Sequence, residues 1–283
     1  MKRDKMTKSS ISLFNLPNLL TIANMLCGII SILLSLHGRV DLAPYPLLLA
    51  ALFDFADGFV ARLLRQQGEL GKQLDSLADM VSFGLAPAIM MMVLLTYSVH
   101  HFYKPDLWSV VPEQFQLKLM FFAWFEKVIH WGSFSWIPFS GLLIAVFSML
   151  RLAKFNIDER QSDQFIGLPT PANTLFFCAF PLIIYANHAS GGLAGTLVTW
   201  MLNPYVLMLL ILLMSFLLIA EWPLMALKFK NFGWKGNELR WGFLITCLFL
   251  IVLLRFWSVP IIIILYLTLS GVSNLTKKRN DEV

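Results

Sequence analysis

Four aspartates stand close together in two segments that are otherwise apolar. Asp54 and Asp57 are three residues apart, and Asp75 and Asp79 are four residues apart, so each pair would share one face of a helix. A charged side chain at the centre of a bilayer costs roughly 2.5–3.5 kcal/mol on insertion scales. Carboxylates that are kept at such a cost indicate a functional site.

A polar run from Arg65 to Lys72 separates the two pairs. It contains Gly68 and Gly71 and is typical of a turn between helices. A helical hairpin of this kind would set the two carboxylate pairs against each other. Carboxylate oxygens without His or Cys suit a hard divalent cation, so the pattern predicts Mg²⁺ or Mn²⁺ rather than Zn²⁺.

Two other interpretations of the aspartates require no enzyme. They could lie at a solvated helix end and pair with neighbouring basic residues, although the apolar neighbours of Asp54 and Asp79 leave few exposed faces. They could also mark the pathway of a divalent-cation transporter, because ionisable residues inside spans line such pathways. A transporter predicts carboxylates spread over several spans, whereas these are concentrated near one hairpin, with Glu221 the main acidic residue at another span end.

The composition places the chain among membrane proteins. It has 283 residues, of which 58% are hydrophobic and 14% charged, and its mean hydropathy of +0.70 lies outside the range of soluble globular proteins. We expect an all-α integral membrane protein with about eight transmembrane helices. The predicted spans are 18–37, 43–65, 75–98, 136–155, 170–187, 204–220, 239–255 and 257–274, with a tight hairpin between the last two.

Lys and Arg residues fall mainly in alternate connections between these spans. Because cytoplasmic connections carry an excess of basic residues, the asymmetry predicts that both termini and the aspartate hairpin face the cytoplasm. It supports an even number of spans and a place in the cell (inner) membrane. The basic residues behind the net charge of +5 are therefore interpreted as signals of membrane orientation, and nucleic-acid binding is not expected.

The same patterns divide the chain into regions. Residues 1–17 form a basic amphipathic juxtamembrane segment and residues 18–187 a transmembrane core with the candidate catalytic residues. Residues 188–274 supply additional transmembrane helices, and residues 275–283 a charged cytoplasmic tail. Within the core, residues 99–135 mix aromatic and charged side chains, which favours an interfacial helix on the outer side over an extra oblique span.

Two basic residues end the predicted fourth span on the cytoplasmic side. Arg151 and Lys154 are one helical turn apart and are followed by Asn156, on the side where the aspartates are expected. Bound cations would already neutralise the carboxylates, so this further positive charge suits a phosphate or a substrate carboxylate. As topology signals alone, the same residues would need no function.

The spacing of the aspartates matches a family signature. The pattern Asp-x2-Asp-Gly-x2-Ala-Arg-x8-Gly-x3-Asp-x3-Asp resembles that of the CDP-alcohol phosphotransferases, which are integral membrane enzymes of phospholipid synthesis. The positions that match it are Asp54, Asp57, Gly58, Ala61, Arg62, Gly71, Asp75 and Asp79. The resemblance covers roughly residues 15–175.

The resemblance implies a two-metal site with an aspartate as general base. Asp54, Asp57 and Asp75 would hold one cation, and Asp54, Asp75 and Asp79 a second, with Asp79 taking the proton from the acceptor hydroxyl. The nucleotide and its diphosphate would be bound by Thr21, Asn24, Asp57, Gly58, Ala61, Arg62 and Gly71. The resemblance also implies a homodimer surrounded by membrane lipid.

Within the family, the chain is most similar to members that transfer the phosphatidyl group of CDP-diacylglycerol to L-serine. The segments 17–24, 75–88, 151–156 and 167–172 carry this similarity, and Met80 stands where members that use glycerol 3-phosphate typically have Lys. The residues expected to bind the acceptor are Ser82, Arg151, Lys154 and Asn156. Glycerol 3-phosphate or inositol stays open as an alternative acceptor.

Overall fold

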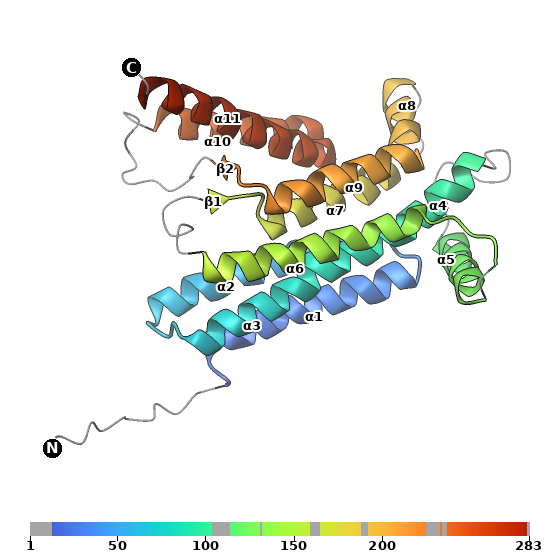
Figure 1. Ribbon diagram of the computed structural model, residues 1–283, viewed down its shortest axis with the longest axis horizontal. Coiled ribbons are helices and arrows are strands. Elements are labelled where there is room, and N and C mark those ends of the chain that lie inside the picture. The colour runs from blue at the N-terminus through green and yellow to red at the C-terminus, as the bar shows by residue number, and fades with distance from the viewer. Residues whose placement is uncertain are drawn as a thin grey trace.

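The computed structural model describes residues 13–103, 114–130, 132–158, 165–187, 192–224, 233 and 237–281. Helices make up nearly all of this structure (Figure 1). They are α1 (Leu16–Leu36), α2 (Pro44–Leu63), α3 (Glu69–Asp79), α4 (Ala86–Tyr103), α5 (Gln114–Ile129), α6 (Leu142–Ile157), α7 (Thr170–Ala186), α8 (Gly192–Met201), α9 (Pro204–Ile219), α10 (Glu238–Leu254) and α11 (Ser258–Asp281). Shorter elements are the π-helical segment η1 (Met80–Leu85) and the 3₁₀ turns η3 (Ile137–Gly141) and η5 (Arg255–Trp257).

The central helix of the bundle is α4, whose side chains are buried on every face. Met90, Leu94 and Tyr97 are among its fully buried residues. Helices α1 and α6 run alongside it, and α2 packs against α1. Helices α7 and α9 form the next layer, and α10 and α11 pair as a hairpin on the outside of that layer (Figure 1). The hairpin that the sequence predicts between the last two spans is confirmed, with its turn at η5.

Local sequence signals set where several of these helices begin. The Asn15 side chain accepts a hydrogen bond from the backbone N–H of Asn18, and Pro17 occupies the first turn of α1. The Asn203 side chain caps α9 in the same way through the N–H groups of Tyr205 and Val206. These caps satisfy backbone donors that would otherwise be left unpaired.

Small residues bring α1 and α6 close to η1. A Cβ atom on Gly28 of α1 would lie 2.7 Å from the Cα of Ser82, so no larger residue fits there without moving one helix. A Cβ atom on Gly84 would lie 3.2 Å from the Cβ of Ser148 on α6. These contacts fix how closely α1 and α6 approach η1, which continues the helix that carries Asp75 and Asp79.

The expectation of an all-helical chain missed one short pairing of strands. Residues β1 (Phe165–Ile166) and β2 (Pro223–Leu224) pair antiparallel, with Phe165 opposite Leu224. Gly167 follows at φ +77, where a side chain is disfavoured, and its N–H donates to the carbonyl of Trp222. The segment before α7 is therefore tied to the end of α9. Strands of two residues leave no periodic pattern by which a sequence could reveal them.

The apolar helices indicate a multi-pass membrane protein. Within the described residues, four segments are long and apolar enough to cross a membrane: Leu16–Leu36, Glu69–Tyr103, Ile137–Ile157 and Glu238–Val272. A fifth is added if α8 and α9, which are bent by 69° at their junction, count as one span. Helices occupy all eight predicted ranges, but the count of eight spans stays a prediction.

Some predicted regions lie partly outside the described residues. Residues 1–12 of the juxtamembrane segment and residues 104–113 and 131 of the insert are outside them, as are residues 282–283 of the tail and the side chains of residues 273–281. The described part of the insert contains α5, where Leu117, Phe121 and Trp124 are buried. Its place at the membrane surface stays a prediction.

Candidate active site

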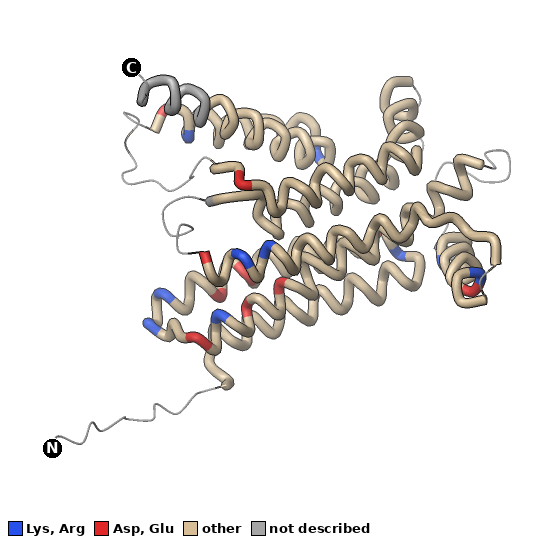
Figure 2. The backbone as a smooth tube through the Cα atoms, viewed as in Figure 1, with Lys and Arg blue, Asp and Glu red and all other residues tan. Residues whose placement is uncertain are grey.

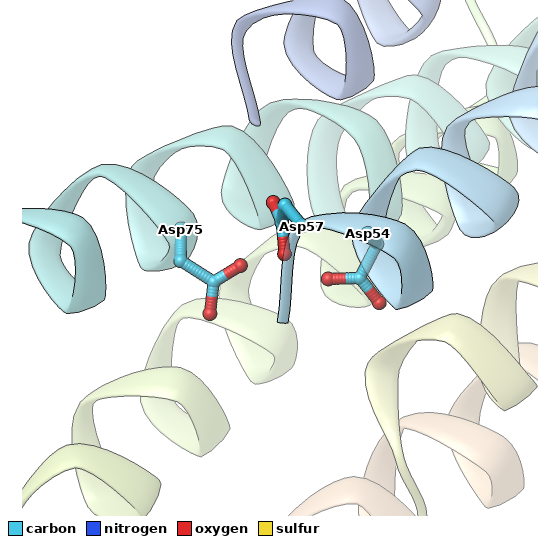
Figure 3. Close-up of side chains that lie close together, drawn as sticks. All are labelled: Asp54, Asp57 and Asp75. Atoms are coloured by element: carbon cyan, nitrogen blue, oxygen red, sulfur yellow. The ribbon is translucent and has the colours of Figure 1, made fainter. Parts of the chain in front are cut away.

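Three of the four aspartates converge from two helices. Asp54 and Asp57 come from α2 and Asp75 from α3, and one carboxylate oxygen from each lies within 4.8 Å of the other two (Figure 3). Asp57 is only 6% exposed. The predicted helical hairpin that faces the carboxylates toward each other is confirmed for these residues.

Asp79 lies one turn beyond Asp75, at the end of α3. It is 8% exposed, and its carboxylate is a near neighbour of that of Asp54. The Nδ2 of Asn24 on α1 donates a hydrogen bond to its Oδ1 at 3.1 Å. Asp79 is therefore outside the group of three but adjoins it through Asp54.

No Lys or Arg forms an ion pair with these aspartates in the described part of the chain. The ion pairs there join Arg39 to Asp41 and Lys154 to Glu221. The Oδ1 atom of Asp75 is buried and has no hydrogen-bond partner. Buried carboxylates are stable only when they are paired or coordinate a metal, and a set of oxygen donors alone fits Mg²⁺ or Mn²⁺. The residues present therefore suit a divalent cation.

A cavity of about 450 Å³ opens beside the cluster, between α1, α2 and α3. Of the residues predicted to bind the nucleotide, Thr21, Asp57, Gly58, Ala61 and Gly71 line it. The Thr21 hydroxyl also donates to Asp57 Oδ2 at 2.6 Å. These residues are brought together as expected.

Two predicted nucleotide residues lie elsewhere. Asn24 is buried against Asp79 and does not line the cavity. Arg62 is exposed, and its Nη1 lies 3.6 Å from where a Cβ on Gly58 would be, so it covers the outer side of that glycine. The cavity is also lined by residues that the sequence analysis did not assign to it: Pro17, Asn18, Gln66, Gln67, Gly68, Glu69 and Lys72. The polar turn between the helices was the signal that could have identified most of them.

The predicted acceptor residues fall into different surroundings. Arg151 is 7% exposed, its Nε has no hydrogen-bond partner, and its charge acts on Asp79. Lys154 is paired with Glu221 at 3.0 Å. Asn156 donates to the hydroxyl of Ser76 on α3 at 2.8 Å. Of these three residues, only Arg151 is both buried and left with a hydrogen-bond donor that could bind a ligand.

Ser82 is packed away from the cavity. It is fully buried against Gly28, and its hydroxyl donates to the carbonyl of Ala78 at 2.9 Å. Two buried polar residues that the sequence analysis did not single out, Ser148 on α6 and Asn173 on α7, have side-chain atoms without a partner. Asn173 lies in the first turn of α7, and the neighbouring Thr174 bonds to the carbonyl of Phe83 in η1.

Charged residues gather at the end of the bundle that holds the site. Figure 2 shows acidic and basic positions around the turn between α2 and α3 and at the end of α6. Lys72 on α3 reaches the backbone carbonyl of Asn156 at 3.0 Å and so links these two elements. The sequence prediction that Arg151, Lys154 and the aspartates lie at one end of the bundle is confirmed.

Comparisons with known proteins agree with this arrangement. A family model described as CDP-alcohol phosphatidyltransferase matches residues 14–227. A CDP-diacylglycerol–serine O-phosphatidyltransferase of Bacillus subtilis is 31% identical over 160 residues, which are 55% of this chain and 69% of that protein. An archaetidylserine synthase of Methanothermobacter thermautotrophicus is 33% identical over 195 residues, which are 67% of this chain and 66% of that protein.

A third relative is a CDP-diacylglycerol–serine O-phosphatidyltransferase of Helicobacter pylori, 30% identical over 162 residues. Those residues are 56% of this chain and 54% of that protein. The match to the family model covers well over half of the chain and includes every residue of the carboxylate cluster and the cavity. The chain belongs to the CDP-alcohol phosphatidyltransferase family.

Proposed function

We propose that this protein transfers the phosphatidyl group of CDP-diacylglycerol to the hydroxyl of L-serine, giving phosphatidylserine and CMP. The observation that carries the proposal is the group of three carboxylates within 4.8 Å of one another beside a cavity of about 450 Å³. The names of the relatives that act on serine support this acceptor.

The carboxylates would hold two divalent cations, of which the first would be bound by Asp54, Asp57 and Asp75. We propose that Asp54, Asp75 and Asp79 hold a second. Bound Mg²⁺ or Mn²⁺ would offset the charge of the diphosphate and of the departing CMP. The chain itself contributes the small residues Gly58 and Ala61, which leave room for the nucleotide beside α2.

Asp79 is the proposed general base. The serine oxygen would form a bond to the phosphorus that carries diacylglycerol, while the bond from that phosphorus to the CMP oxygen breaks. The proton of the serine hydroxyl would pass to the Asp79 carboxylate. The burial of Asp79 and its position next to Asp54 support this role.

The proposal is tested with full-length protein purified in detergent and supplied with CDP-diacylglycerol, L-serine and Mg²⁺ or Mn²⁺. We expect CMP release that depends on both the cation and serine. Glycerol 3-phosphate and inositol serve as competing acceptors, and faster CMP release with either would reject serine. Cation flux in proteoliposomes without CMP release would favour a transporter instead.

Arg151 is the residue that we propose to bind the carboxylate of serine. Its buried guanidinium has an unpartnered Nε, whereas the Lys154 ammonium is already paired with Glu221. Arg151→Ala is expected to raise the KM for serine at least tenfold, because a buried charged hydrogen bond contributes about 1.5–3 kcal/mol. Lys154→Ala is the matched control, with a change of less than about threefold. An unchanged serine KM in Arg151→Ala would reject the assignment.

We further propose a homodimer with eight spans, both termini in the cytoplasm and the site facing the cytoplasm across the cell (inner) membrane. In Figure 1, the start of α1, the α2–α3 turn and the end of α11 lie toward the same end of the molecule. A cysteine introduced at Gln66 should react with a membrane-impermeant thiol reagent only after the cells are opened. Labelling in intact cells would reverse the orientation.

A further inference from the structure

The buried face of α1 contacts two of the four aspartates, Asp57 and Asp79. The Thr21 hydroxyl donates to Asp57 Oδ2 at 2.6 Å, and one turn later the Asn24 amide donates to Asp79 Oδ1 at 3.1 Å. Thr21 also lines the cavity, whereas Asn24 is 0% exposed and does not. The only polar group that Asn24 contacts through its side chain, among the described residues, is the Asp79 carboxylate.

We propose that Asn24 is a positioning residue that orients Asp79 for proton transfer, and that it does not bind the nucleotide. This inference rests on the proposed function, in which Asp79 is the general base. An amide is costly to bury unless both of its ends are hydrogen-bonded, and the Oδ1 of Asn24 has no partner. An apolar side chain at this position would avoid that cost but could not donate a hydrogen bond to Asp79. The hydrogen bond to Asp79 is therefore the advantage that Asn has over an apolar residue here.

The direction of this hydrogen bond is fixed by charge. A carboxylate accepts hydrogen bonds, so only the NH₂ end of the amide can face it favourably. The contact between Gly28 and Ser82, where a Cβ would lie 2.7 Å from the Cα, holds α1 against η1 one turn further on. Asn24 therefore approaches Asp79 from a backbone that has little freedom to move.

The hydrogen bond assigns different tasks to the two oxygens of Asp79. Oδ1 accepts from Asn24, and the carboxylate also lies beside that of Asp54. The proton of the serine hydroxyl would pass to Oδ2 as the serine oxygen bonds to phosphorus and the bond from phosphorus to the CMP oxygen breaks. Asn24 neither gains nor loses a proton in this step. Its contribution is to hold the carboxylate plane in one orientation, and partners of this kind are typically worth about 10- to 100-fold in activity.

The test compares Asn24→Leu and Asn24→Gln with Ser31→Ala in the full-length protein in detergent. Ser31 is a matched control on the same helix, equally buried, whose hydroxyl donates to the carbonyl of Ala43 at 2.8 Å. We expect Asn24→Leu to lower kcat about 10- to 100-fold with the KM for CDP-diacylglycerol within about twofold. Asn24→Gln, which keeps the amide, should retain more activity than Asn24→Leu, and Ser31→Ala should stay near wild type.

Two further measurements separate positioning from folding. Binding of CDP-diacylglycerol, measured directly by calorimetry, should be unchanged in Asn24→Leu, which also shows that the variant is folded. In an Asp79→Asn background, Asn24→Leu should cause no further loss, because residues that act through one group are not additive. Weaker nucleotide binding at constant kcat, or a full additional loss in the double variant, would overturn the inference. Wild-type protein that releases no CMP would instead reject the proposed function.

Discussion

Asp75→Asn is expected to lower CMP formation by at least about 10³-fold. Asp75 supplies one oxygen of the three-carboxylate group, and its Oδ1 has no protein partner. Asn keeps the shape of the side chain but removes its negative charge. A bound cation contributes several kcal/mol of charge stabilisation, and each 1.36 kcal/mol changes a rate about tenfold, so the loss of a ligand accounts for a factor of this size.

The measurement is CMP release as a function of Mn²⁺ concentration, together with Mn²⁺ binding followed by electron paramagnetic resonance. Asp41→Asn is a matched control, because Asp41 pairs with Arg39 before the start of α2, whereas Asp54 and Asp57 lie in the second half of that helix. It should change activity little, as partly exposed ion pairs contribute little. Wild-type Mn²⁺ affinity in Asp75→Asn would remove this residue from the metal site.

Asp79→Asn is expected to lower kcat about 10²–10⁴-fold, which is the usual contribution of a general base. An amide cannot accept the proton of the serine hydroxyl. Because Asp54, Asp57 and Asp75 would still hold one cation and Asp79 does not line the cavity, CDP-diacylglycerol binding should be retained. Single-turnover rates and equilibrium binding of CDP-diacylglycerol, measured on the same preparation, separate the two effects.

A loss of nucleotide binding equal to the loss of rate would make Asp79 chiefly a metal ligand. Asp54→Asn provides the comparison, because Asp54 is the carboxylate beside Asp79 that also belongs to the group of three. We expect Asp54→Asn to weaken both Mn²⁺ binding and rate. The two variants should therefore differ in binding even if both are inactive.

The helices and the carboxylate cluster could be predicted from the sequence because both depend on local spacing. Apolar runs determine spans, and steps of three and four residues put Asp54 with Asp57 and Asp75 with Asp79 on common faces. The glycines of the intervening turn then leave one simple arrangement, a hairpin. The close approach of Asp54, Asp57 and Asp75 follows from it.

The rest of the site depends on contacts between residues that are far apart in the chain. The rotation of α1 about its axis directs the Asn24 side chain toward Asp79 and away from the cavity. The sequence of α1 alone does not indicate that rotation. The pair of Lys154 with Glu221 joins positions 67 residues apart. Of the two basic residues on α6, Arg151 is therefore the one with an unused donor. Likewise, Ser82 packs against Gly28 of α1, and the sequence near Ser82 gives no sign of that contact between helices.

The π-helical segment η1 separates two helical faces that have different tasks. Its wider turn is equivalent to one extra residue in an α-helix, and one residue corresponds to about 100° of rotation. Upstream, Asp75 faces Asp54 and Asp57, and Asp79 lies beside Asp54, while downstream α4 is enclosed on all sides. A chain shorter by one residue in this segment could regain regular α-helical hydrogen bonds, but it would then aim either the carboxylates or the tightly packed methionines of α4 in the wrong direction. The π-helical turn rotates α4 relative to α3, so that one continuous helix can direct carboxylates to the site at one end and pack in the core at the other.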